Sequence, residues 1–338
     1  MTKKTWLLIP LLILALITAT VLVPSAFVTL WPSSAKQNAS TSPSLVELDN
    51  QDDFEIKVYL KDQDKIVPMS LEKYVRGVVA AEMPITFQDE ALKAQAVAAR
   101  TYVVRRLLAG TKTEQGADVS DDHNDGQAYS TDEKLQKNWG MFNYPKNISK
   151  INNAVNATKG KVLLYQGKPI EALFFSTSSG KTENSEDYWG KEVPYLRSVD
   201  SPWDLKSEKY AADLTLSLVD FSSKLGITAV SASTMSKLIA PVERTVADHI
   251  KKIKVGDKVF SGPDFRKLLG LRSTMFTWEI DRGNNTIVFH TKGYGHDVGL
   301  SQYGADGMAK EGKKAEEILL HYYQGVQVGN ARDLLQTK

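Results

Sequence analysis

The sequence contains no cysteine. This absence excludes disulfide bonds, zinc sites with thiolate ligands and cysteine nucleophiles. The sequence also lacks an excess of charge of one sign, because the formal net charge is only +2 at pH 7. No block of lysine or arginine occurs. Such a chain has no segment suited to the phosphate backbone of a nucleic acid. Its 338 residues, 42% of them hydrophobic, suffice for one large or two ordinary folded domains.

One long hydrophobic run is present, and it lies at the N-terminus. Residues 6–31 contain no charged side chain and are rich in Leu, Ile, Ala and Val. A spanning helix needs about 20 apolar residues, and Lys3 and Lys4 before the run favour a cytoplasmic N-terminus. We therefore predict an uncleaved transmembrane anchor over residues 1–31, with the remaining chain outside the cytoplasm. The alternative is a cleaved signal peptide, for which residues 24–26 match a cleavage site poorly.

The residues after the anchor divide into a linker and a folded part. Residues 32–50 are rich in Ser, Thr and Asn, which predicts a flexible linker before a domain over 51–338. Hydrophobic periodicity predicts a strand from Phe54, helices over 71–82 and 88–109, a loop over 111–150, a hairpin of 162–165 with 170–175, a smaller inserted lobe over 205–260, a strand over 286–290 and a helix over 314–323. The expected fold class is α+β, with mixed helices and antiparallel strands forming a grooved core.

The helix predicted over residues 71–82 places a carboxyl group on its apolar side. At about 100° per residue, Glu82 projects near the centre of the apolar stripe, and Pro84 ends the helix. Desolvation at such a place raises the pKa of a carboxyl group, which suits a general acid at neutral pH. The alternative is a glutamate at the helix end that turns outward to water, and the helix alone does not separate the two.

The next predicted helix carries two polar residues at the margins of its apolar stripe. Gln95 and Arg100 flank a stripe that contains small alanines, from where they could reach a groove. The alternative for Arg100 is an arginine whose aliphatic stem lies along the edge of the core.

Six segments resemble the SpoIID/LytB family. They are 80–84, 94–102, 175–182, 194–199, 269–273 and 293–305, which read AAEMP, AQAVAARTY, FSTSSGKT, PYLRSV, LGLRS and GYGHDVGLSQYGA. Because all six occur in the family's order, the resemblance is specific, and it extends over residues from about 54 to 330. One departure is Asp297, where the relatives usually have glycine.

The resemblance implies a lytic transglycosylase. Its substrate would be peptidoglycan glycan strands already stripped of stem peptides, cut between N-acetylmuramic acid and N-acetylglucosamine during engulfment in sporulation. The implied partners are a SpoIIP-like amidase and a SpoIIM-like membrane protein, and the implied location is the septal or engulfing membrane. No metal or cofactor is expected. The alternative function is a non-catalytic peptidoglycan-binding module that stimulates an amidase.

Site residues follow from the same resemblance. Glu82 matches the family's catalytic glutamate, and the substrate-binding candidates are Arg100, Tyr195, Arg197, Asp204, Gln95, Ser178 and His296. Arg100 and Arg197 would hold the lactyl carboxylates of muramic acid, since an arginine can grip a carboxylate with two parallel hydrogen bonds. Tyr195 would pack on a sugar face.

The polar loop before residue 130 offers metal ligands that do not complete a site. Some relatives carry cysteine and histidine for zinc in the loop that matches 118–129, whereas this chain has no cysteine. Asp121, Asp125, Gly126 and Asp132 fit four positions of a calcium loop, but His123 does not. A solvated acidic loop is the favoured interpretation.

Two further patterns are set aside. Residues 178–182 imitate the end of a phosphate-binding loop, but Phe175 stands where its first glycine is required. Glu183, Glu186 and Asp187 could supply a second catalytic carboxyl group, although a solvated charged turn is favoured.

Overall fold

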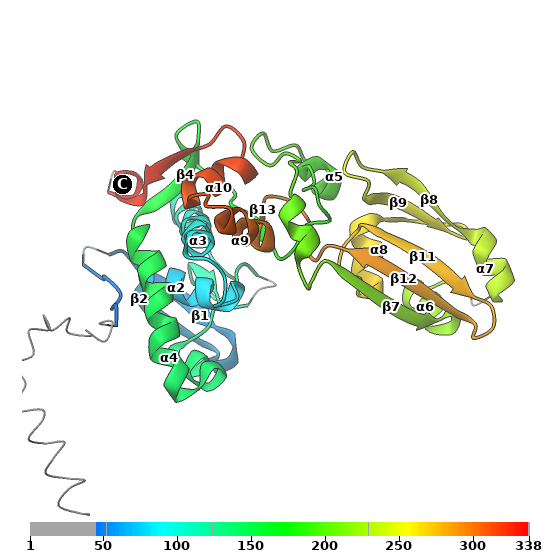
Figure 1. The fold of residues 1–338 in the computed structure, drawn as a ribbon, viewed down its shortest axis with the longest axis horizontal. Helices are drawn as coiled ribbons and strands as arrows, with labels where there is room; N and C mark the ends of the chain where they lie inside the picture. The colour runs from blue at the N-terminus through cyan, green and yellow to red at the C-terminus, as the bar shows by residue number, and fades with distance from the viewer. Residues whose placement is uncertain (1–44, 52, 123–124, 229, 337–338) are drawn as a thin grey trace, which may run out of the picture. The chain divides into compact units, whose positions relative to one another are not determined.

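The computed structural model describes residues 45–51, 53–122, 125–228 and 230–336, which fall within one compact unit. The predicted anchor over residues 1–31 lies outside the described residues. Across the described residues, no helix is long and apolar enough to cross a membrane. Helices mix with mainly antiparallel sheets, which confirms the α+β expectation (Figure 1).

The first sheet begins with the predicted strand. It contains β1 (Glu55–Leu60), β2 (Lys65–Ser70) and β3 (Val119–Ser120) in the order β2-β1-β3, with the 3-10 turn η1 (Lys61–Gln63) joining β1 to β2. β1 pairs antiparallel with β2 and parallel with β3. Ile56, Val58 and Leu60 are buried while the intervening residues are more exposed, which is the period of a strand with one face on a core.

Both predicted N-terminal helices are confirmed. α2 (Leu71–Glu82) starts at Ser70, whose hydroxyl accepts a hydrogen bond from the Lys73 amide, and it ends where Met83 is extended ahead of Pro84. α3 (Asp89–Ala109) ends at Gly110, which has the left-handed φ of 65° that favours glycine.

The predicted loop over residues 111–150 is wrong for its second half. α4 (Asp132–Ala157) begins after Thr131, whose hydroxyl accepts from the Lys134 amide. Gly140, with φ of 75°, interrupts it, so α4 is two helical segments joined at a kink. Pro145 is the fifth residue of the second segment, and it has no N–H to donate to the Met141 carbonyl one turn earlier. Because the break and the proline interrupt the helical spacing of apolar residues, the sequence did not predict a helix here.

The remaining elements of the first core come from both sides of an inserted lobe. They are β4 (Lys161–Tyr165), β5 (Lys168–Pro169), β6 (Phe174–Phe175), α5 (Ser185–Trp189), η2 (Pro202–Lys206), β13 (Leu300–Ser301), α9 (Gln302–Lys310), α10 (Ala315–Tyr322), β14 (Gln327–Asn330) and α11 (Ala331–Leu335). The predicted hairpin is only partly correct, because β5 pairs with β4 whereas β6 leaves that sheet and pairs parallel with β13.

The inserted lobe has its own hydrophobic core. It contains β7 (Ala211–Ser217), α6 (Leu218–Leu225), α7 (Ala232–Leu238), β8 (Ile239–Arg244), β9 (Ile250–Val255), β10 (Lys258–Ser261), α8 (Gly262–Leu269), β11 (Phe276–Asp281) and β12 (Thr286–Lys292). Phe221, Phe265, Phe276 and Phe289 form a cluster of ring contacts at its centre. The lobe is longer than the predicted 205–260, because β12 returns to pair with β7.

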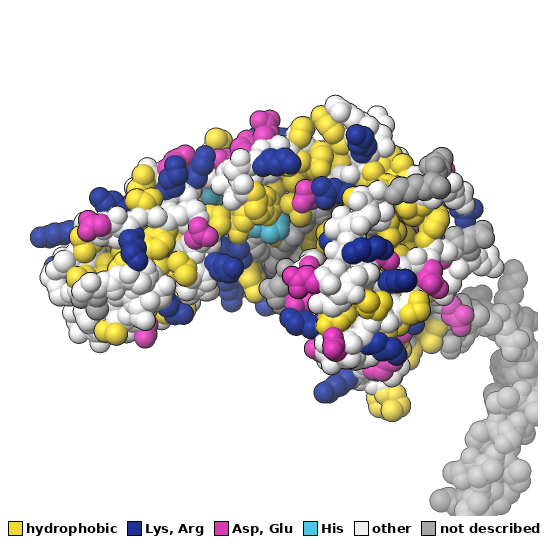
Figure 2. Space-filling model, turned by 180° about the vertical axis from the view of Figure 1, so that it is seen from behind, with side chains coloured by type: hydrophobic (Ala, Val, Ile, Leu, Met, Phe, Trp, Pro, Cys, Tyr) yellow, Lys and Arg dark blue, Asp and Glu magenta, His cyan; other side chains and the backbone are white. Residues whose placement is uncertain are grey.

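Charges on the surface are mixed. In Figure 2, Lys and Arg side chains are interspersed with Asp and Glu over the described residues of the visible face. This agrees with the near-neutral composition and gives that face no single-sign region that would attract a polyanion.

A buried ion pair joins the elements around α2. Arg100 of α3 is 0% exposed, and its Nε and Nη2 atoms donate to the two carboxylate oxygens of Glu72 at 2.8 and 2.6 Å. Its Nη1 donates to the Lys161 carbonyl at 3.1 Å, and Glu72 also accepts from the Gly160 amide at 3.2 Å. The guanidinium is therefore fully engaged inside the protein. The structure places Arg100 in a buried ion pair and not among the residues that line the Glu82 pocket described below.

We predict that Arg100→Ala destabilises the fold by about 3–5 kcal/mol, because it leaves the Glu72 carboxylate buried without its partner. Urea unfolding measures the change. Arg105→Ala is the matched control on the same helix, since Arg105 and Glu171 form a half-exposed pair at 3.4 Å whose loss costs about 0–1 kcal/mol. Unchanged stability with lost glycan affinity would restore the substrate-binding interpretation.

Candidate active site

Glu82 is the last residue of α2 and opens into a pocket of about 440 Å³. Its Oε1 accepts a hydrogen bond from the Ala128 amide at 2.8 Å, which orients the carboxyl group. The stripe residues Val75, Val78 and Val79 are fully buried, whereas Glu82 is half-buried. Glu82 therefore continues the stripe at the end of α2, where it faces a cavity instead of the core.

The loop before α4 forms one wall of this pocket. Gly126 and Gln127 line it, and Gly126 approaches Tyr102 so closely that a Cβ there would lie 2.6 Å from the phenol oxygen. Glycine at 126 thus allows the loop to close over α3 beside Glu82. The sequence pattern gave this loop no role beside the catalytic candidate.

The acidic residues of that loop contact partners in their own chain. Asp118 pairs with Lys112, and Asp122 pairs with Lys61. Both oxygens of Asp132 accept from Arg76 Nη2 at 2.6 Å. Among the described residues, which omit 123 and 124, no three His, Asp or Glu side chains lie together as metal ligands would.

The opposite wall comes from α5 and the glycine-rich segment before β13. Trp189, Tyr294 and His296 line it, together with Phe175. The His296 ring lies 5.2 Å from the Trp189 ring and 5.5 Å from the Phe175 ring, measured between centroids. The pocket therefore presents aromatic surfaces opposite the polar loop.

His296 is a neutral member of this wall. Burial, reinforced by the positive charge of Arg266, lowers the pKa of its imidazole to about 4. Its Nδ1 accepts from the Val298 amide at 3.1 Å, so the proton of the neutral ring is on Nε2. His296 lies in the pocket as predicted, but an imidazole held neutral with Nδ1 occupied is not arranged to exchange protons at that atom.

Two glutamines in the pocket keep unused hydrogen-bonding groups. Both amide atoms of Gln127 and the Nε2 atom of Gln302 are buried without a hydrogen-bond partner in the described structure. An unpaired buried amide costs free energy, so such groups are commonly satisfied by water or ligand. Gln302 lies inside a segment that carried the family resemblance, but nothing in its spacing singled it out.

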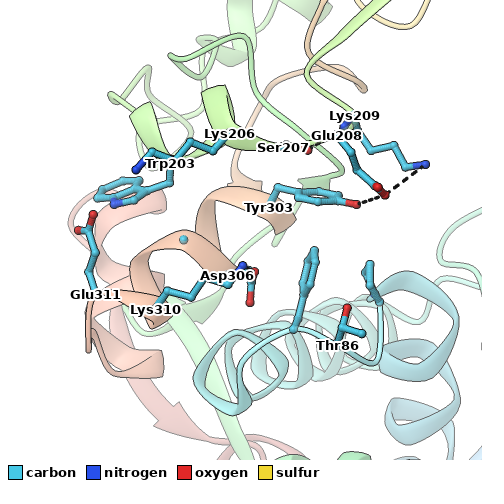
Figure 3. A pocket seen from close by; sticks show the side chains of 13 residues that line it. Thr86, Trp203, Lys206, Ser207, Glu208, Lys209, Tyr303, Asp306, Lys310 and Glu311 are labelled. Atoms are coloured by element: carbon cyan, nitrogen blue, oxygen red, sulfur yellow. Dashed lines mark hydrogen bonds and ion pairs between the residues drawn. The ribbon is translucent and has the colours of Figure 1, made fainter.

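A second pocket has a volume of about 730 Å³ (Figure 3). Pro84 follows Glu82 by two residues, and Tyr303 directly follows Gln302, so the two pockets share these chain segments. In the larger pocket the Tyr303 hydroxyl donates to Glu208 at 3.2 Å, and Lys310 pairs with Asp306 at 2.6 Å. Trp203 and Phe87 add aromatic surface.

Three further substrate-binding candidates, Gln95, Ser178 and Asp204, are each 0% exposed and do not line the Glu82 pocket. Both amide atoms of Gln95 are buried without a hydrogen-bond partner in the described structure. Asp204 accepts from Ser201 at 2.5 Å and from Ser301 at 2.7 Å, and burial raises its pKa. These contacts join η2 to the start of α9, beside the larger pocket.

The close approach of α9 to η2 requires glycine at residue 304. A Cβ at residue 304 would lie 2.0 Å from the Tyr322 hydroxyl and 2.8 Å from Asp204. The glycine therefore lets α9 approach the Asp204 carboxylate.

Tyr195 and Arg197 do not line the Glu82 pocket. The Tyr195 hydroxyl accepts from the Glu171 amide at 2.9 Å. Arg197 donates to both oxygens of Glu186, at 2.8 and 2.5 Å, and its side chain is 28% exposed. A glycan carboxylate at Arg197 would have to displace Glu186.

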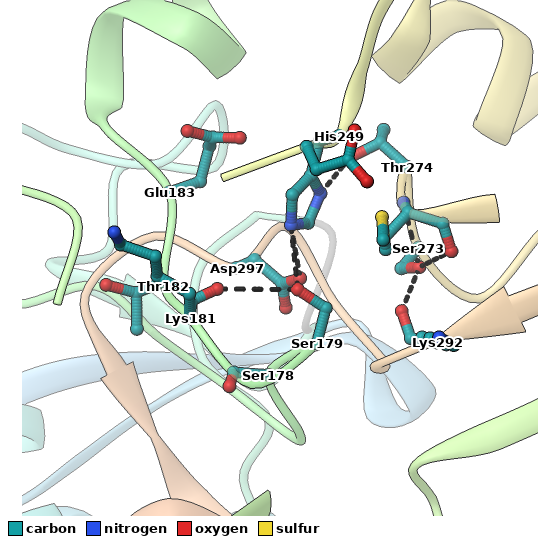
Figure 4. A network of polar contacts seen from close by, with 12 residues as sticks. Ser178, Ser179, Lys181, Thr182, Glu183, His249, Ser273, Thr274, Lys292 and Asp297 are labelled. Carbon is teal, nitrogen blue, oxygen red and sulfur yellow. Dashed lines mark hydrogen bonds and ion pairs between the residues drawn. The ribbon is translucent and has the colours of Figure 1, made fainter. Parts of the chain in front are cut away.

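A buried polar cluster lies behind the aromatic wall (Figure 4). His249 Nδ1 lies 2.8 Å from Thr274 Oγ1, and its Nε2 lies 3.0 Å from Ser179 Oγ and 3.2 Å from Asp297 Oδ2. Burial lowers the pKa of His249 to about 4 and raises that of Asp297 well above its usual range. Because Ser179 and Asp297 approach the same nitrogen, the cluster lacks the relay geometry of a serine nucleophile.

Glu183 belongs to the same cluster, so the predicted solvated turn is wrong at this residue. It is 1% exposed, accepts from the Thr245 hydroxyl at 2.5 Å, and has its pKa raised to about 7 by burial. Glu186 and Asp187 pair instead with Arg197 and Lys251. None of the three lines the Glu82 pocket.

Comparison with known proteins gives one consistent group. A family model described as stage II sporulation protein, SpoIID, matches residues 59–165. Stage II sporulation protein D of Bacillus amyloliquefaciens is 46% identical over 281 residues, covering 83% of this chain and 80% of the relative. The protein of the same name from Bacillus subtilis is 44% identical over 277 residues, covering 82% and 79%. A Bacillus subtilis protein named amidase enhancer is 31% identical over 302 residues, 74% of this chain but 39% of that relative.

We predict that Glu183→Gln stabilises the fold increasingly as the pH rises from about 4.5 to about 7. Because the folded-state pKa of Glu183 is raised, its favourable contribution is complete below the unfolded value near 4.5 and is lost as the pH rises through 7. The gain at pH 8 should be of order 2–3 kcal/mol. Melting curves of variant and parent across this range measure it. An equal difference at pH 4.5 and pH 8 would contradict the raised pKa.

Proposed function

The chain belongs to the SpoIID family, and from that premise we propose that it is a peptidoglycan lytic transglycosylase with Glu82 as its catalytic acid. Membership supports a role in cell-wall remodelling during sporulation. The proposed substrate is a glycan strand stripped of its stem peptides. The proposed bond lies between N-acetylmuramic acid and N-acetylglucosamine.

One observation carries the proposal. Glu82 is the one carboxyl group among the described residues that line its pocket. Ordinary glycosidases place a pair of carboxyl groups across the scissile bond, one as acid and one as base or nucleophile. A pocket with a single carboxyl group suits a reaction in which the substrate supplies its own nucleophile.

The C6 hydroxyl of the muramic acid residue can be that nucleophile. Protonated Glu82 gives its proton to the glycosidic oxygen as the bond from C1 to that oxygen breaks. The C6 oxygen bonds to C1, and its proton passes to the Glu82 carboxylate, which restores the acid. No water is consumed, so the muramic acid end becomes a 1,6-anhydro sugar. General acid catalysis of this kind contributes about 10²–10⁴-fold to the rate.

The walls of the pocket suit the rings, hydroxyl groups and acetamido groups of sugars. Trp189 and Tyr294 offer aromatic faces to the apolar faces of sugar rings. The unpaired amides of Gln127 and Gln302 can bond hydroxyl or acetamido groups. We propose that the larger pocket lined by Trp203 and Tyr303 holds neighbouring sugars of the same strand.

We also propose a location and two partners for this chain. The uncharged residues 6–31 would hold the chain in the septal or engulfing membrane, with the catalytic domain outside the cytoplasm. A SpoIIP-like amidase would supply peptide-free strands, and a SpoIIM-like membrane protein would complete the assembly.

A second function has a specific observation in its favour. The relative named amidase enhancer is similar over 74% of this chain. Under this alternative the pocket binds glycan without cutting it and stimulates a partner amidase. Purified chain incubated with peptide-free strands separates the two, because only the enzyme releases fragments.

We predict that Glu82→Gln folds with an unchanged melting temperature and loses glycan cleavage by at least about 10²-fold, since an amide cannot donate and recover the proton. Fragment release from peptide-free strands measures the loss. Glu279→Gln, an exposed residue of β11, is the matched control and should cleave normally. Cleavage near the parent rate by Glu82→Gln would exclude this residue as the acid.

We predict that Trp189→Ala weakens strand binding about tenfold, through loss of the aromatic face worth about 1.4 kcal/mol. Binding is measured in the Glu82→Gln background so that the strand stays intact. The control is Phe142→Ala, because Phe142 is exposed and lies outside both pockets. Equal affinity of both variants would remove Trp189 from the binding surface.

A further inference from the structure

Two large apolar residues that follow each other in α4 have exposed side chains. Met141 is 82% exposed and Phe142 is 95% exposed, the highest values among the exposed large hydrophobic side chains of the described residues. We call this pair the apolar knuckle. Single exposed hydrophobic residues are ordinary, but adjacent large ones mark interaction sites more often.

The backbone holds the apolar knuckle outward. Gly140 breaks α4 with its φ of 75°, so Met141 and Phe142 begin the second helical segment. Behind them, the rings of Trp139 and Tyr144 lie 6.2 Å apart, and the Tyr144 hydroxyl donates to Asp132 at 2.9 Å. The start of the second segment of α4, which bears the apolar knuckle, is therefore held by a ring contact and a hydrogen bond.

The surroundings of the apolar knuckle are basic. Lys137 and Lys146 lie on either side of it in the sequence, are exposed, and form no ion pair within the described part of the chain. Of the nearby acidic groups, Asp132 pairs with Arg76, whereas Glu133 is exposed at the start of α4, seven residues before Gly140. Exposed apolar side chains flanked by lysines are the composition of surfaces that bind anionic membranes.

The chain enters the folded domain along the same helix. The Val46 amide donates to Ser149 at 2.8 Å, Asn152 donates to the Val46 carbonyl at 2.8 Å, and the Asp49 amide donates to Asn156 at 2.9 Å. Residues 46–49 therefore run parallel to α4 (Figure 1). Followed backwards, this segment advances from the C-terminal end of α4 toward the end that bears the apolar knuckle.

We infer that the apolar knuckle inserts into the headgroup region of a lipid bilayer, with Lys137 and Lys146 against anionic headgroups. The inference rests on the proposed membrane anchor. Residues 32–44 separate the uncharged run from the folded domain and can span at most about 45 Å when extended. Such a short tether keeps the domain at high effective concentration beside the bilayer, so two side chains suffice for contact.

The absence of cysteine permits a direct test with the full chain. Phe142→Cys provides a unique attachment site for an environment-sensitive fluorophore, and Val246→Cys provides the control, because Val246 is 80% exposed in the inserted lobe. Both proteins are reconstituted in vesicles of equal parts phosphatidylglycerol and phosphatidylcholine. We expect a blue shift and quenching by lipid-attached quenchers at position 142, and neither at position 246.

A second measurement tests the charges. Lys137→Gln with Lys146→Gln should reduce quenching at position 142 in these vesicles without changing the melting temperature. The same emission at positions 142 and 246 overturns the inference, as does burial of position 142 only after a partner protein is added. Flotation of the chain with the vesicles reports the anchor separately, and its failure overturns the anchor and the inference together. Glycan cleavage in solution reports the proposed activity independently of both.

Discussion

The buried ion pair between Glu72 and Arg100 fixes the elements on which the pocket depends. Glu72 lies in the first turn of α2, Arg100 lies in the middle of α3, and their remaining contacts reach the chain at Gly160 and Lys161, where β4 begins. A buried pair contributes little over a well-packed apolar alternative, but losing one partner is costly, so it acts mainly to specify a single arrangement. Ten residues further along α2, about 15 Å away, the same rigid helix delivers Glu82.

The pocket around Glu82 combines one carboxyl group with neutral surroundings. His296 is held neutral by burial, and the amides of Gln127 and Gln302 carry no charge. The ion pair of Lys310 with Asp306 lines the larger pocket and not the Glu82 pocket. Because the described lining residues include no second carboxyl group, the proposed reaction would use Glu82 as both acid and base. A substrate that carries its own nucleophile fits this arrangement, and so does binding without cleavage.

Sequence patterns predicted the elements whose signals are local. α2 and α3 were predicted from the apolar spacing, from the Ser70 cap and from Gly110. The resemblance to a family pointed to Glu82 as the candidate catalytic acid. α4 was missed because Gly140 and Pro145 interrupt its period. Arg100 was assigned to a groove because its partner, Glu72, lies 28 residues away and the pairing leaves no local signal. Gln127 and Gln302 are brought together by the tertiary fold alone, so no spacing in the chain could have revealed them.

The inserted lobe is coupled to the aromatic wall of the pocket through polar contacts. Thr245 of the lobe donates to Glu183, and His249 lies against Asp297. Asp297 directly follows His296, so a contact that holds one also constrains the ring of the other. Asp297 has a φ of 62°, which a residue with a side chain seldom adopts. The Asp297 carboxyl group is buried 3.2 Å from His249 Nε2, so the wall is positioned partly by a lobe that contributes no residue to the described lining.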